Sequence, residues 1–503
     1  MNTPDHHIII IGAGFGGLGA AIALHQAGIE GFTILERAGD IGGTWRDNRY
    51  PDVATDVPGM SYQFSYEKNP NWTRIFPKGA EIIQYINHCA DKYQLRQHIR
   101  LNIEVMSRTW DADTHSWRLD LSDGTTITAR YVIAALGQFV EHKAPDIKGL
   151  NTFTGKLMPT QEWDDDYDLT GKRIGVIGTG ATAVQMIPQV AKVAGRLHVF
   201  QRRAIWVFPK AEYIIPQFWR TALVRVPGML PLLYRTVSTL LGLGIYGLTV
   251  KGAKHPWLST IPMRVGKAYL RLQVRDAELR KKLTPDYAFG CKRPSVSNTY
   301  YRTYTKSHVE LVTDGIAEIT PTGVRTVDGR ERELDVLILA TGFQLSTTPD
   351  VYRKRPVVGV DGFDLADFYQ NNPLRAYEGV CLPELPNAFS IFGPYSWCGG
   401  SWHEMVETQS RIIVRVLTEA ARRGATSVAV TPEANDRFFQ FIRSQSHDTL
   451  IRSSMCATSN TFYLDHHGDS SLIRPTSAAQ AKRASETFSL GDFAFTTMTS
   501  ESR

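Results

Sequence analysis

The sequence predicts an α/β protein, because one pattern of strand, glycine turn and helix occurs in it twice. Residues 8–17 and 174–183 each begin with an apolar run that opens into closely spaced glycines. Each copy continues through a helical pattern to a second apolar strand, then to a hairpin signal and a third apolar strand. This order is typical of two Rossmann-like dinucleotide-binding domains.

The first glycine turn follows residues 8–11, a β-branched run that predicts a parallel strand buried on both faces. Gly12, Gly14 and Gly17 have the spacing G-x-G-x-x-G. Gly12 permits the tight turn, Gly14 lets the backbone approach a pyrophosphate, and Gly17 allows the helix to pack against the strand. The anion would then lie at the helix N-terminus, so we also include Phe15 among the cofactor-binding residues.

The second strand, residues 32–35, is followed by Glu36. A carboxylate at this place accepts hydrogen bonds from an adenosine ribose and repels a 2′-phosphate. The first site is therefore predicted to bind FAD or NAD rather than NADP. A glycine turn alone can serve packing, but the complete pattern favours dinucleotide binding.

The second unit, residues 173–185, repeats the strand and the glycine turn. Its strand at residues 197–200 is followed by Gln201, Arg202 and Arg203 instead of an acid. An arginine here suits the 2′-phosphate of NADP, although paired arginines also occur in solvated turns. The cofactor-binding residues predicted for this unit are Gly178, Gly180, Thr182, Ala183 and Arg202.

A hairpin signal follows each unit, at Asp123-Gly124 and at Asp328-Gly329. The region 214–300 lacks strand alternation and is expected to be a helical insertion in the NADP domain. We predict an FAD-binding domain at residues 1–145 and 379–503, and an NADP-binding domain at 153–213 and 301–378. The tail from about Thr476 onward is polar enough to be loosely held.

Composition limits the functional classes. The chain has 503 residues, 43% of them apolar, which allows a large core divided into two or three domains. The net charge is +6, but the basic residues do not form one long run, so we expect no nucleic-acid partner. Five cysteines without a C-x-x-C pair indicate reduced thiols and a cytoplasmic protein, and they argue against a disulfide reductase. We predict no metal site.

Two apolar runs raise the question of a membrane. The N-terminal run is only four residues long, so we expect no secretory signal. Residues 236–250 are apolar but lie between Arg235 and Lys251, which makes the run shorter than the ~20 residues of a membrane span. We expect a buried or site-lining helix and no membrane association, with peripheral contact as the alternative.

Several short motifs carry a more specific resemblance: Gly42-Gly43-Thr44-Trp45, Asn48-Arg49-Tyr50-Pro51, Phe153-x-Gly155 with Trp163-Asp164, Lys292-Arg293-Pro294 and Ala340-Thr341-Gly342-Phe343. Together, over nearly the whole chain, they resemble the type I Baeyer-Villiger monooxygenases, which are class B flavoprotein monooxygenases. The resemblance implies that NADPH reduces a bound FAD and that a C4a-peroxyflavin forms with O2. One oxygen atom is then inserted next to a ketone carbonyl to give an ester or lactone.

The resemblance also assigns roles to single residues. Arg293 matches an arginine that stabilises the peroxyflavin and the anionic adduct, a task that suits fixed positive charge in a dry site. Asp56 matches an acid that orients this arginine, although its spacing alone would indicate a turn or cap residue. Lys292 is expected to contact the 2′-phosphate. The residues expected along the FAD are Gly43, Thr44, Trp45, Asp56, Val105 and Gln138.

Pro159 is a departure from the family pattern, because it occupies the place of a histidine thought to support NADPH binding and domain movement. Proline has neither a titratable group nor an N–H donor. Its presence puts coupling in doubt and leaves two alternatives open: a sulfur- or nitrogen-oxygenating flavin monooxygenase, or an uncoupled NADPH oxidase. A redox sensor without turnover is a third. The substrate, its regioselectivity, the oligomeric state and the pathway do not follow from the sequence.

Overall fold

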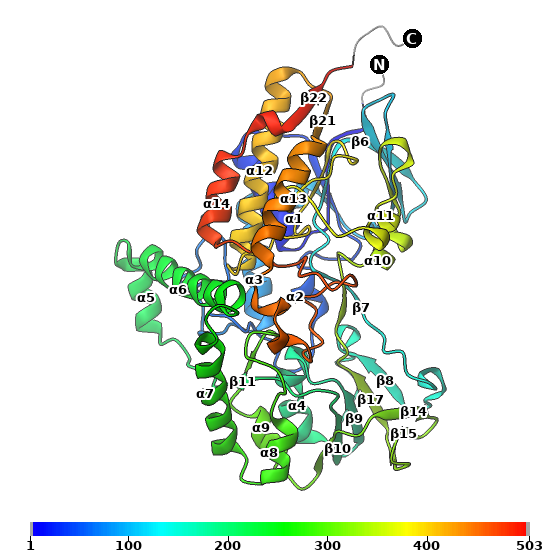
Figure 1. The fold of residues 1–503 in the computed structure, drawn as a ribbon, viewed down its shortest axis with the longest axis vertical. Helices are drawn as coiled ribbons and strands as arrows, with labels where there is room; N and C mark the ends of the chain where they lie inside the picture. Colours follow the sequence, from blue (N-terminus) through cyan, green and yellow to red (C-terminus); the bar gives the residue numbers. More distant parts are fainter. Residues whose placement is uncertain (1–3, 499–503) are drawn as a thin grey trace.

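The structure, a computed structural model, describes residues 4–498 and consists of two α/β domains arranged one above the other (Figure 1). The upper domain contains an eight-stranded sheet and the lower one a five-stranded sheet. The chain enters the lower domain after its first third and later returns to the upper one, as the colours in Figure 1 show. The predicted α/β class with two parallel-sheet units is confirmed.

The first sheet is centred on β1 (His6–Ile11), which lies parallel to β2 (Phe32–Leu35) and β6 (Thr126–Ala134). Ile8, Ile9 and Ile10 are completely buried because this strand has neighbours on both sides and packed residues on both faces. The other strands of this sheet are β3 (Ile99–Arg100), β4 (Val105–Asp111), β5 (Ser116–Leu121), β19 (Val357–Val358) and β20 (Ala388–Ser390). The hairpin predicted at Asp123-Gly124 joins β5 to β6.

One face of this sheet is covered by α1 (Phe15–Gln26) packed against α12 (Trp402–Arg423). A Cβ atom at Gly19 would lie 2.4 Å from Val406, so glycine permits the close approach of the two helices. The N-terminus of α12 carries a capping box formed by Ser401 and Glu404. Further helices of this domain are α2 (Thr44–Asp47), α3 (Gly79–Lys92), α13 (Pro432–Ser446) and α14 (Ala478–Thr487).

The second sheet is wholly parallel, in the order β13 (Val309–Val312), β10 (Arg196–Phe200), β9 (Arg173–Ile177), β17 (Val336–Leu339) and β8 (Lys156–Pro159). One face packs against α4 (Ala181–Val193) and α9 (Tyr300–Thr303), and the other against β14 (Ile316–Thr320), β15 (Gly323–Thr326) and β16 (Glu331–Glu333). The hairpin predicted at Asp328-Gly329 joins β15 to β16. Pro159 ends β8, an edge strand, where a missing N–H is tolerated.

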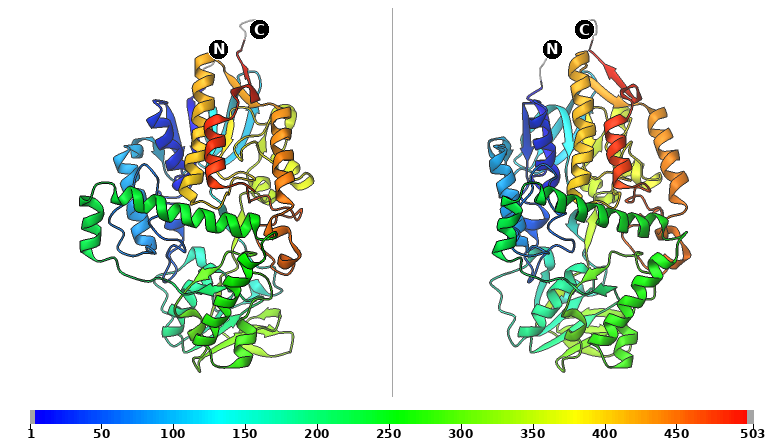
Figure 2. Two further views of the ribbon diagram at one scale, coloured as in Figure 1. Left: turned by 60° about the vertical axis from the view of Figure 1, so that its left-hand side comes forward. Right: turned by 90° about the vertical axis from the view of Figure 1, so that its left-hand side faces the viewer.

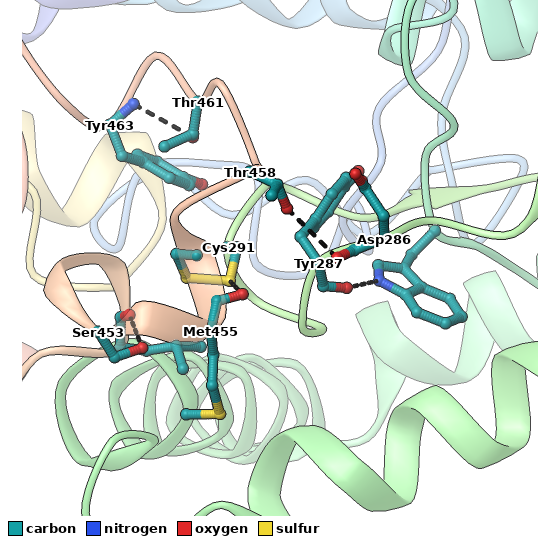
Figure 3. The surroundings of a disulfide bond; sticks show 11 residues. Asp286, Tyr287, Cys291, Ser453, Met455, Thr458, Thr461 and Tyr463 are labelled. Atoms are coloured by element: carbon teal, nitrogen blue, oxygen red, sulfur yellow. Dashed lines mark hydrogen bonds between the residues drawn. A yellow bond between two sulfur atoms is a disulfide. The ribbon is translucent and has the colours of Figure 1, made fainter.

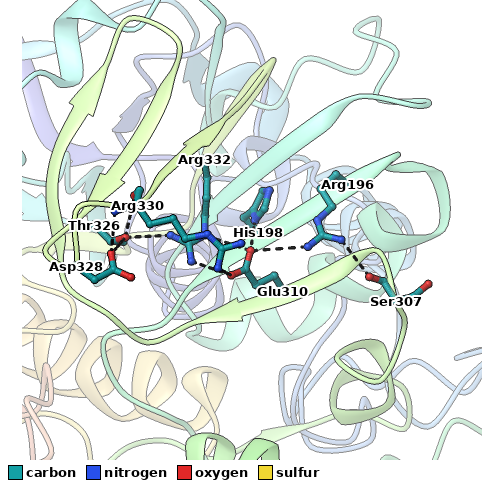
Figure 4. Close-up of polar contacts among 8 residues, drawn as sticks. All are labelled: Arg196, His198, Ser307, Glu310, Thr326, Asp328, Arg330 and Arg332. Carbon is teal, nitrogen blue, oxygen red and sulfur yellow. Dashed lines mark hydrogen bonds and ion pairs between the residues drawn. The ribbon is translucent and has the colours of Figure 1, made fainter.

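Glu310 ties the strands of this domain together through a charged network (Figure 4). It accepts hydrogen bonds from Arg332 Nη2 at 2.8 Å and pairs with His198 Nδ1 at 2.8 Å. Arg196 and Arg330 lie farther from the same carboxylate, at 3.9 and 3.5 Å. The hydrogen bond from Arg332 is the main reason why the pKa of Glu310 falls to about 2. One ionised carboxylate therefore links β10, β13 and β16.

The two domains are joined by a ribbon in which β7 (Phe139–His142) lies antiparallel to β18 (Phe343–Leu345). Each strand follows a glycine with positive φ, 76° at Gly137 and 88° at Gly342, where the chain leaves its sheet. The chain therefore crosses between the domains twice along one path.

The segment after the second crossing differs from the expected division. We assigned residues 301–378 to the second domain, but β19 pairs with β4 of the first sheet. Leu365 and Tyr369 of α11 (Leu365–Asn371), which follows α10 (Pro349–Lys354), are buried in the core beneath that sheet. The stretch from β19 onward therefore lies with the first domain, because its apolar side chains complete that core.

The inserted region is helical, as predicted, but its longest helix is not buried. It contains α5 (Gln217–Arg225), α6 (Met229–Lys251), α7 (Trp257–Gln273) and α8 (Ala277–Leu283), and the short strands β11 (Val207–Phe208) and β12 (Ser295–Val296) pair beside it. Within residues 4–498, α6 is the one helix that is long and apolar enough to cross a membrane. The expectation was a buried or site-lining helix, and because only 11% of its apolar window is buried, the prediction that it is buried is wrong.

Two further expectations are corrected. Cys291 and Cys456 form a disulfide, whereas Cys89, Cys381 and Cys398 are free and buried. The two bonded residues are 165 positions apart, so no local spacing of cysteines predicted the bond. The tail is ordered as far as it is described: Ser477 caps α14, and β22 (Phe493–Thr496) pairs with β21 (Ser427–Val430). Residues 499–503 of the expected loose tail lie outside the described residues.

Candidate active site

The first glycine turn forms an open cradle in front of α1. A Cβ atom at Gly17 would lie 1.8 Å from the Gly12 carbonyl oxygen, so Gly17 serves packing. Gly14 is different, because the protein atom nearest to its Cβ position is the Gly43 Cα at 3.7 Å. No side chain caps the N-terminus of α1, which leaves its first N–H groups available to an anion. This arrangement fits a pyrophosphate.

Phe15 is the first residue of α1. Its ring packs on the His403 ring, with 4.2 Å between the ring centroids.

Glu36 is almost fully buried beside this cradle. Its carboxylate accepts hydrogen bonds from the Ala13 and Ala38 amides at 2.8 and 3.0 Å, and from Arg46 Nη1 at 3.0 Å. Two carboxylate oxygens can accept about four hydrogen bonds, so a ribose hydroxyl can still be accommodated. Val105, by contrast, is the first residue of β4 and is buried in the core.

Gln138 follows Gly137 in the connection from β6 to β7 and is 4% exposed. Neither its amide oxygen nor its amide nitrogen has a hydrogen-bond partner among the described residues. A buried amide without partners is costly, and a ligand that offers both a donor and an acceptor, such as a flavin ring, satisfies it. Thr44 and Trp45 lie in α2, and Trp45 Nε1 donates to the Tyr62 hydroxyl at 3.0 Å.

Arg293 and Asp56 form a hydrogen-bonded ion pair between loops 237 positions apart. Their side chains are 31% and 22% exposed. Burial alone would lower the pKa of Arg293, but the Asp56 carboxylate more than offsets this, so the pKa lies above its ordinary value. The guanidinium is therefore a permanent positive charge. The sequence predicted both residues, and the structure brings them together.

The loop of Asp56 is held by the second domain. Gln185 on α4 accepts a hydrogen bond from the Ala54 amide at 3.2 Å and donates one to the Ala54 carbonyl at 3.1 Å. The Tyr50 hydroxyl donates to the same Gln185 side chain at 3.3 Å. Sequence reasoning missed Gln185, although a polar residue after the run of small and apolar residues was a usable signal.

The loop of Arg293 is held by the C-terminal part of the chain (Figure 3). The disulfide joins Cys291, two residues before Arg293, to Cys456. The Thr458 hydroxyl donates to the Asp286 carbonyl at 3.2 Å in the same contact. The ion pair is therefore held by Gln185 on one side and by the segment around Cys456 on the other. No sequence spacing indicated the contact with the Cys456 segment.

Arg203 lies at the second glycine turn, where its carbonyl accepts a hydrogen bond from the Thr179 hydroxyl at 2.9 Å. Burial lowers the pKa of Lys292 to about 8, and the charges of Arg202 and Arg203 contribute to the decrease. Within residues 4–498 none of them forms a salt bridge, and Arg203 Nη1 is buried without a partner. The three cations outnumber Asp286, the one acid whose charge acts on Lys292, and the 2′-phosphate of NADPH would balance the excess positive charge.

The glycines of the second turn repeat those of the first. A Cβ at Gly178 would lie 2.3 Å from the Ala340 carbonyl oxygen, whereas at Gly180 it would meet no atom within 4 Å. Gly180 thus resembles Gly14 in leaving an open approach to the N-terminus of α4. Ala183 is fully buried against the sheet, and Thr182 lies in the first turn of α4 and is partly exposed.

Comparisons with known proteins agree with this geometry. Residues 9–216 match the family profile described as "Pyridine nucleotide-disulphide oxidoreductase". A "Baeyer-Villiger monooxygenase" of Streptomyces coelicolor is 35% identical over 491 residues, which cover 97% of this chain and 92% of that protein. The chain belongs to the Baeyer-Villiger monooxygenases. The predicted family, reaction and enzyme class are therefore confirmed.

Solved structures extend the likeness of this Baeyer-Villiger monooxygenase to its cofactors. One, named OTEMO and complexed with FAD and NADP, has a TM-score of 0.87 and 26% identity, over 98% of this chain and all of that one. A cyclohexanone monooxygenase from Rhodococcus sp. Phi1 bound to NADP+ has a TM-score of 0.87 and 25% identity, over 99% of this chain and all of that one. The enzyme thus uses FAD and NADPH to insert one oxygen atom of O2 beside a ketone carbonyl.

The two open glycines give a matched pair of variants. Gly14→Val is expected to yield folded but colourless protein, because its side chain meets the pyrophosphate rather than the protein. Gly180→Val is expected to retain the yellow flavin and to lose its reduction by NADPH. Flavin absorbance per chain and the rate of bleaching by NADPH measure both outcomes. Full flavin occupancy in Gly14→Val would contradict the assignment of the first glycine turn as the binding site for the FAD pyrophosphate.

The Lys292 pKa of about 8 predicts a pH dependence of NADPH use. Below this pH the ammonium attracts the 2′-phosphate, and above it the side chain is neutral. The KM for NADPH is expected to rise roughly fivefold as the pH passes upward through this pKa, which corresponds to about 1 kcal/mol. The KM for NADH should stay flat, and Lys292→Met should remove the change. A pH-independent KM for NADPH in the wild type would argue against phosphate contact by Lys292.

Proposed function

We propose that Arg293 is the catalytic cation of this Baeyer-Villiger monooxygenase and that Asp56 holds it in place. The observation that carries the proposal is the ion pair itself, which fixes a permanent positive charge where the loop of Asp56 meets the loop of Arg293. Negative charge develops on the ketone oxygen as the carbonyl is attacked. A guanidinium that is already oriented stabilises this charge without reorganisation.

The cofactors bind on either side of this pair. FAD supplies the oxygen-transfer chemistry once NADPH has reduced it. The proposed FAD-binding residues are Gly12, Gly14, Phe15, Gly17, Glu36, Gly43, Thr44, Trp45, Asp56, Val105 and Gln138. The proposed NADP-binding residues are Gly178, Gly180, Thr182, Ala183, Arg202 and Lys292, and Arg203 joins them because of its unpartnered Nη1.

The substrate is a bulky, apolar ketone in this proposal. Trp397 and Tyr463 stack with ring centroids 5.3 Å apart and planes 9° apart, and Tyr463 lies close enough to Arg293 for its pKa to respond to that charge. Burial raises the pKa of Tyr463 to about 12, so the phenol stays neutral. The names of the structural relatives, steroid and cyclohexanone monooxygenase, support an apolar cyclic ketone.

Heteroatom oxygenation and uncoupled NADPH oxidation are the second candidate functions, and Pro159 favours them. It stands at the end of β8, where the family fingerprint has a histidine. Product analysis with a ketone and a thioether separates the candidates.

The domain division that we propose assigns residues 1–145 and 357–503 to the FAD-binding domain and residues 153–213 and 301–345 to the NADP-binding domain. Residues 214–300 form the helical insertion. A cytoplasmic location is proposed on the three cysteines that are free, Cys89, Cys381 and Cys398, because the Cys291–Cys456 bond removes the other two from that argument.

Arg202→Ala should narrow the preference for NADPH over NADH. The loss of one phosphate contact is expected to raise the KM for NADPH roughly tenfold and to leave the KM for NADH unchanged. Flavin reduction by each nucleotide, followed in stopped flow, measures the difference. If the wild type prefers NADH, the phosphate assignment of the second site is wrong.

Arg293→Ala should lower ester formation from a ketone by roughly a hundredfold or more, through loss of charge stabilisation. Flavin content and reduction by NADPH should change little, because neither glycine turn includes Arg293. Hydrogen peroxide release should rise as ester disappears. Product chromatography and a peroxide assay follow both.

Arg302→Ala is the matched control, because Arg302 is exposed and comes from the same region of the chain. It is expected to behave as wild type in both assays. If Arg293→Ala oxygenates ketones as fast as the control, Arg293 is not the catalytic cation. If the wild type forms only sulfoxide and peroxide, the second candidate function replaces the first.

A further inference from the structure

The helical insertion contains an unusual separation of charge. Residues 213–275 contain no Asp or Glu, although 50 of the 503 residues of the chain are acidic. The same stretch has nine basic residues: Arg220, Arg225, Arg235, Lys251, Lys254, Arg264, Lys267, Arg271 and Arg275. Its charge exceeds the +6 of the whole chain, so the excess positive charge of the protein is concentrated here.

The same stretch also exposes most of the apolar surface. Among residues 4–498, twenty large hydrophobic side chains are exposed, and fourteen of them lie between Tyr213 and Leu272. A soluble surface scatters such residues singly, so this concentration indicates a binding surface.

On α7 the exposed residues form one stripe. Trp257, Ile261, Val265 and Leu272 are 58%, 53%, 51% and 80% exposed. At 100° per residue they fall within about 80° of the helix circumference. Arg264, Lys267 and Arg271 lie immediately beside the stripe on the same helix. An exposed apolar face with basic residues along its edge is typical of helices that lie in a membrane interface.

The neighbouring helices continue this surface. On α6, Leu232, Leu240 and Leu243 are 66%, 66% and 59% exposed on one face, while Tyr234 and Ser238 are buried on the other. On α5 the rings of Phe218 and Trp219 lie 4.5 Å apart and are both exposed. Figure 2 shows the three helices in green, in front of both domains on one side of the molecule.

We propose that this surface, formed by α5, α6 and α7, docks the enzyme on the face of a membrane that contains anionic lipid. The apolar stripes enter the boundary between head groups and acyl chains, and the basic residues beside them contact lipid phosphates. A second copy of the chain fits less well, because nine positive charges would face nine others. The sequence-based expectation was no membrane association, with peripheral contact as the alternative, and the proposal here takes up that alternative.

The helix α6 lies on the membrane in this arrangement and does not cross it. Its C-terminal turns are packed against the protein: Thr249 and Val250 are buried, and a Cβ at Gly290 would lie 2.7 Å from Leu248. Gly290 precedes Arg293 by three residues, so the docked helix backs onto the active-site loop. If the substrate is an apolar ketone, as proposed above, it can reach the site from the bilayer; the docking itself does not rest on that assignment.

Sedimentation of the FAD-loaded enzyme with lipid vesicles tests the proposal. Vesicles of phosphatidylcholine mixed with phosphatidylglycerol are expected to bind the wild type roughly tenfold more tightly than phosphatidylcholine alone, and high salt should remove the difference. Absence of binding to the anionic vesicles would overturn the proposal, whatever substrate the enzyme takes.

Variants locate the binding surface. Ile261→Ser, Leu240→Ser and Lys267→Glu are each expected to weaken binding severalfold, with flavin content and NADPH oxidation in solution unchanged. Val327→Ser and Lys192→Glu change exposed residues elsewhere and should bind as wild type does. Equal binding by both sets would overturn the assignment to this face. A lipid-independent dimer that Ile261→Ser dissociates, seen by light scattering, would show that a second copy covers the surface instead.

Discussion

The ion pair between Arg293 and Asp56 is the interaction on which the arrangement of this enzyme depends. A guanidinium that is only partly exposed to water is stabilised by a carboxylate close by, and the carboxylate here comes from a loop 237 positions away. Other contacts fix the position of each loop. Gln185 binds the loop of Asp56, and the disulfide from Cys291 anchors the loop of Arg293. The proposed reacting centre is thus a junction of both domains with the C-terminal segment.

The two nucleotide cradles share one backbone design and differ in charge. Gly14 and Gly180 leave the same open approach to a helix N-terminus. Beside the first lies the carboxylate of Glu36, and beside the second lie Lys292 and two arginines. We propose that this difference directs a nucleotide with a 2′-phosphate to one cradle and one with a free ribose to the other. Repetition of the fold therefore does not make the cofactors interchangeable.

The positive charge of this chain is concentrated in one region, which its net charge does not show. A net charge of +6 describes a mildly basic protein, yet residues 213–275 carry more positive charge than the whole chain. The remainder is slightly acidic, as is common for a soluble enzyme. The absence of Asp and Glu from that stretch was visible in the sequence. Its meaning was not, because only the structure shows that the apolar residues between the cations are exposed.

The sequence by itself determined the local elements: the strand at Ile8–Ile11, the turns at Gly12 and Gly178, and both hairpins, because periodicity and glycine placement report the faces of single elements. Resemblance supplied Arg293 and Asp56. Only the tertiary structure decided which partners meet. The Cys291–Cys456 bond, the contacts of Gln185 and the placement of Val357–Val358 in the first sheet all join residues far apart in the chain. Such pairings leave no periodic trace, since they depend on how complete domains pack.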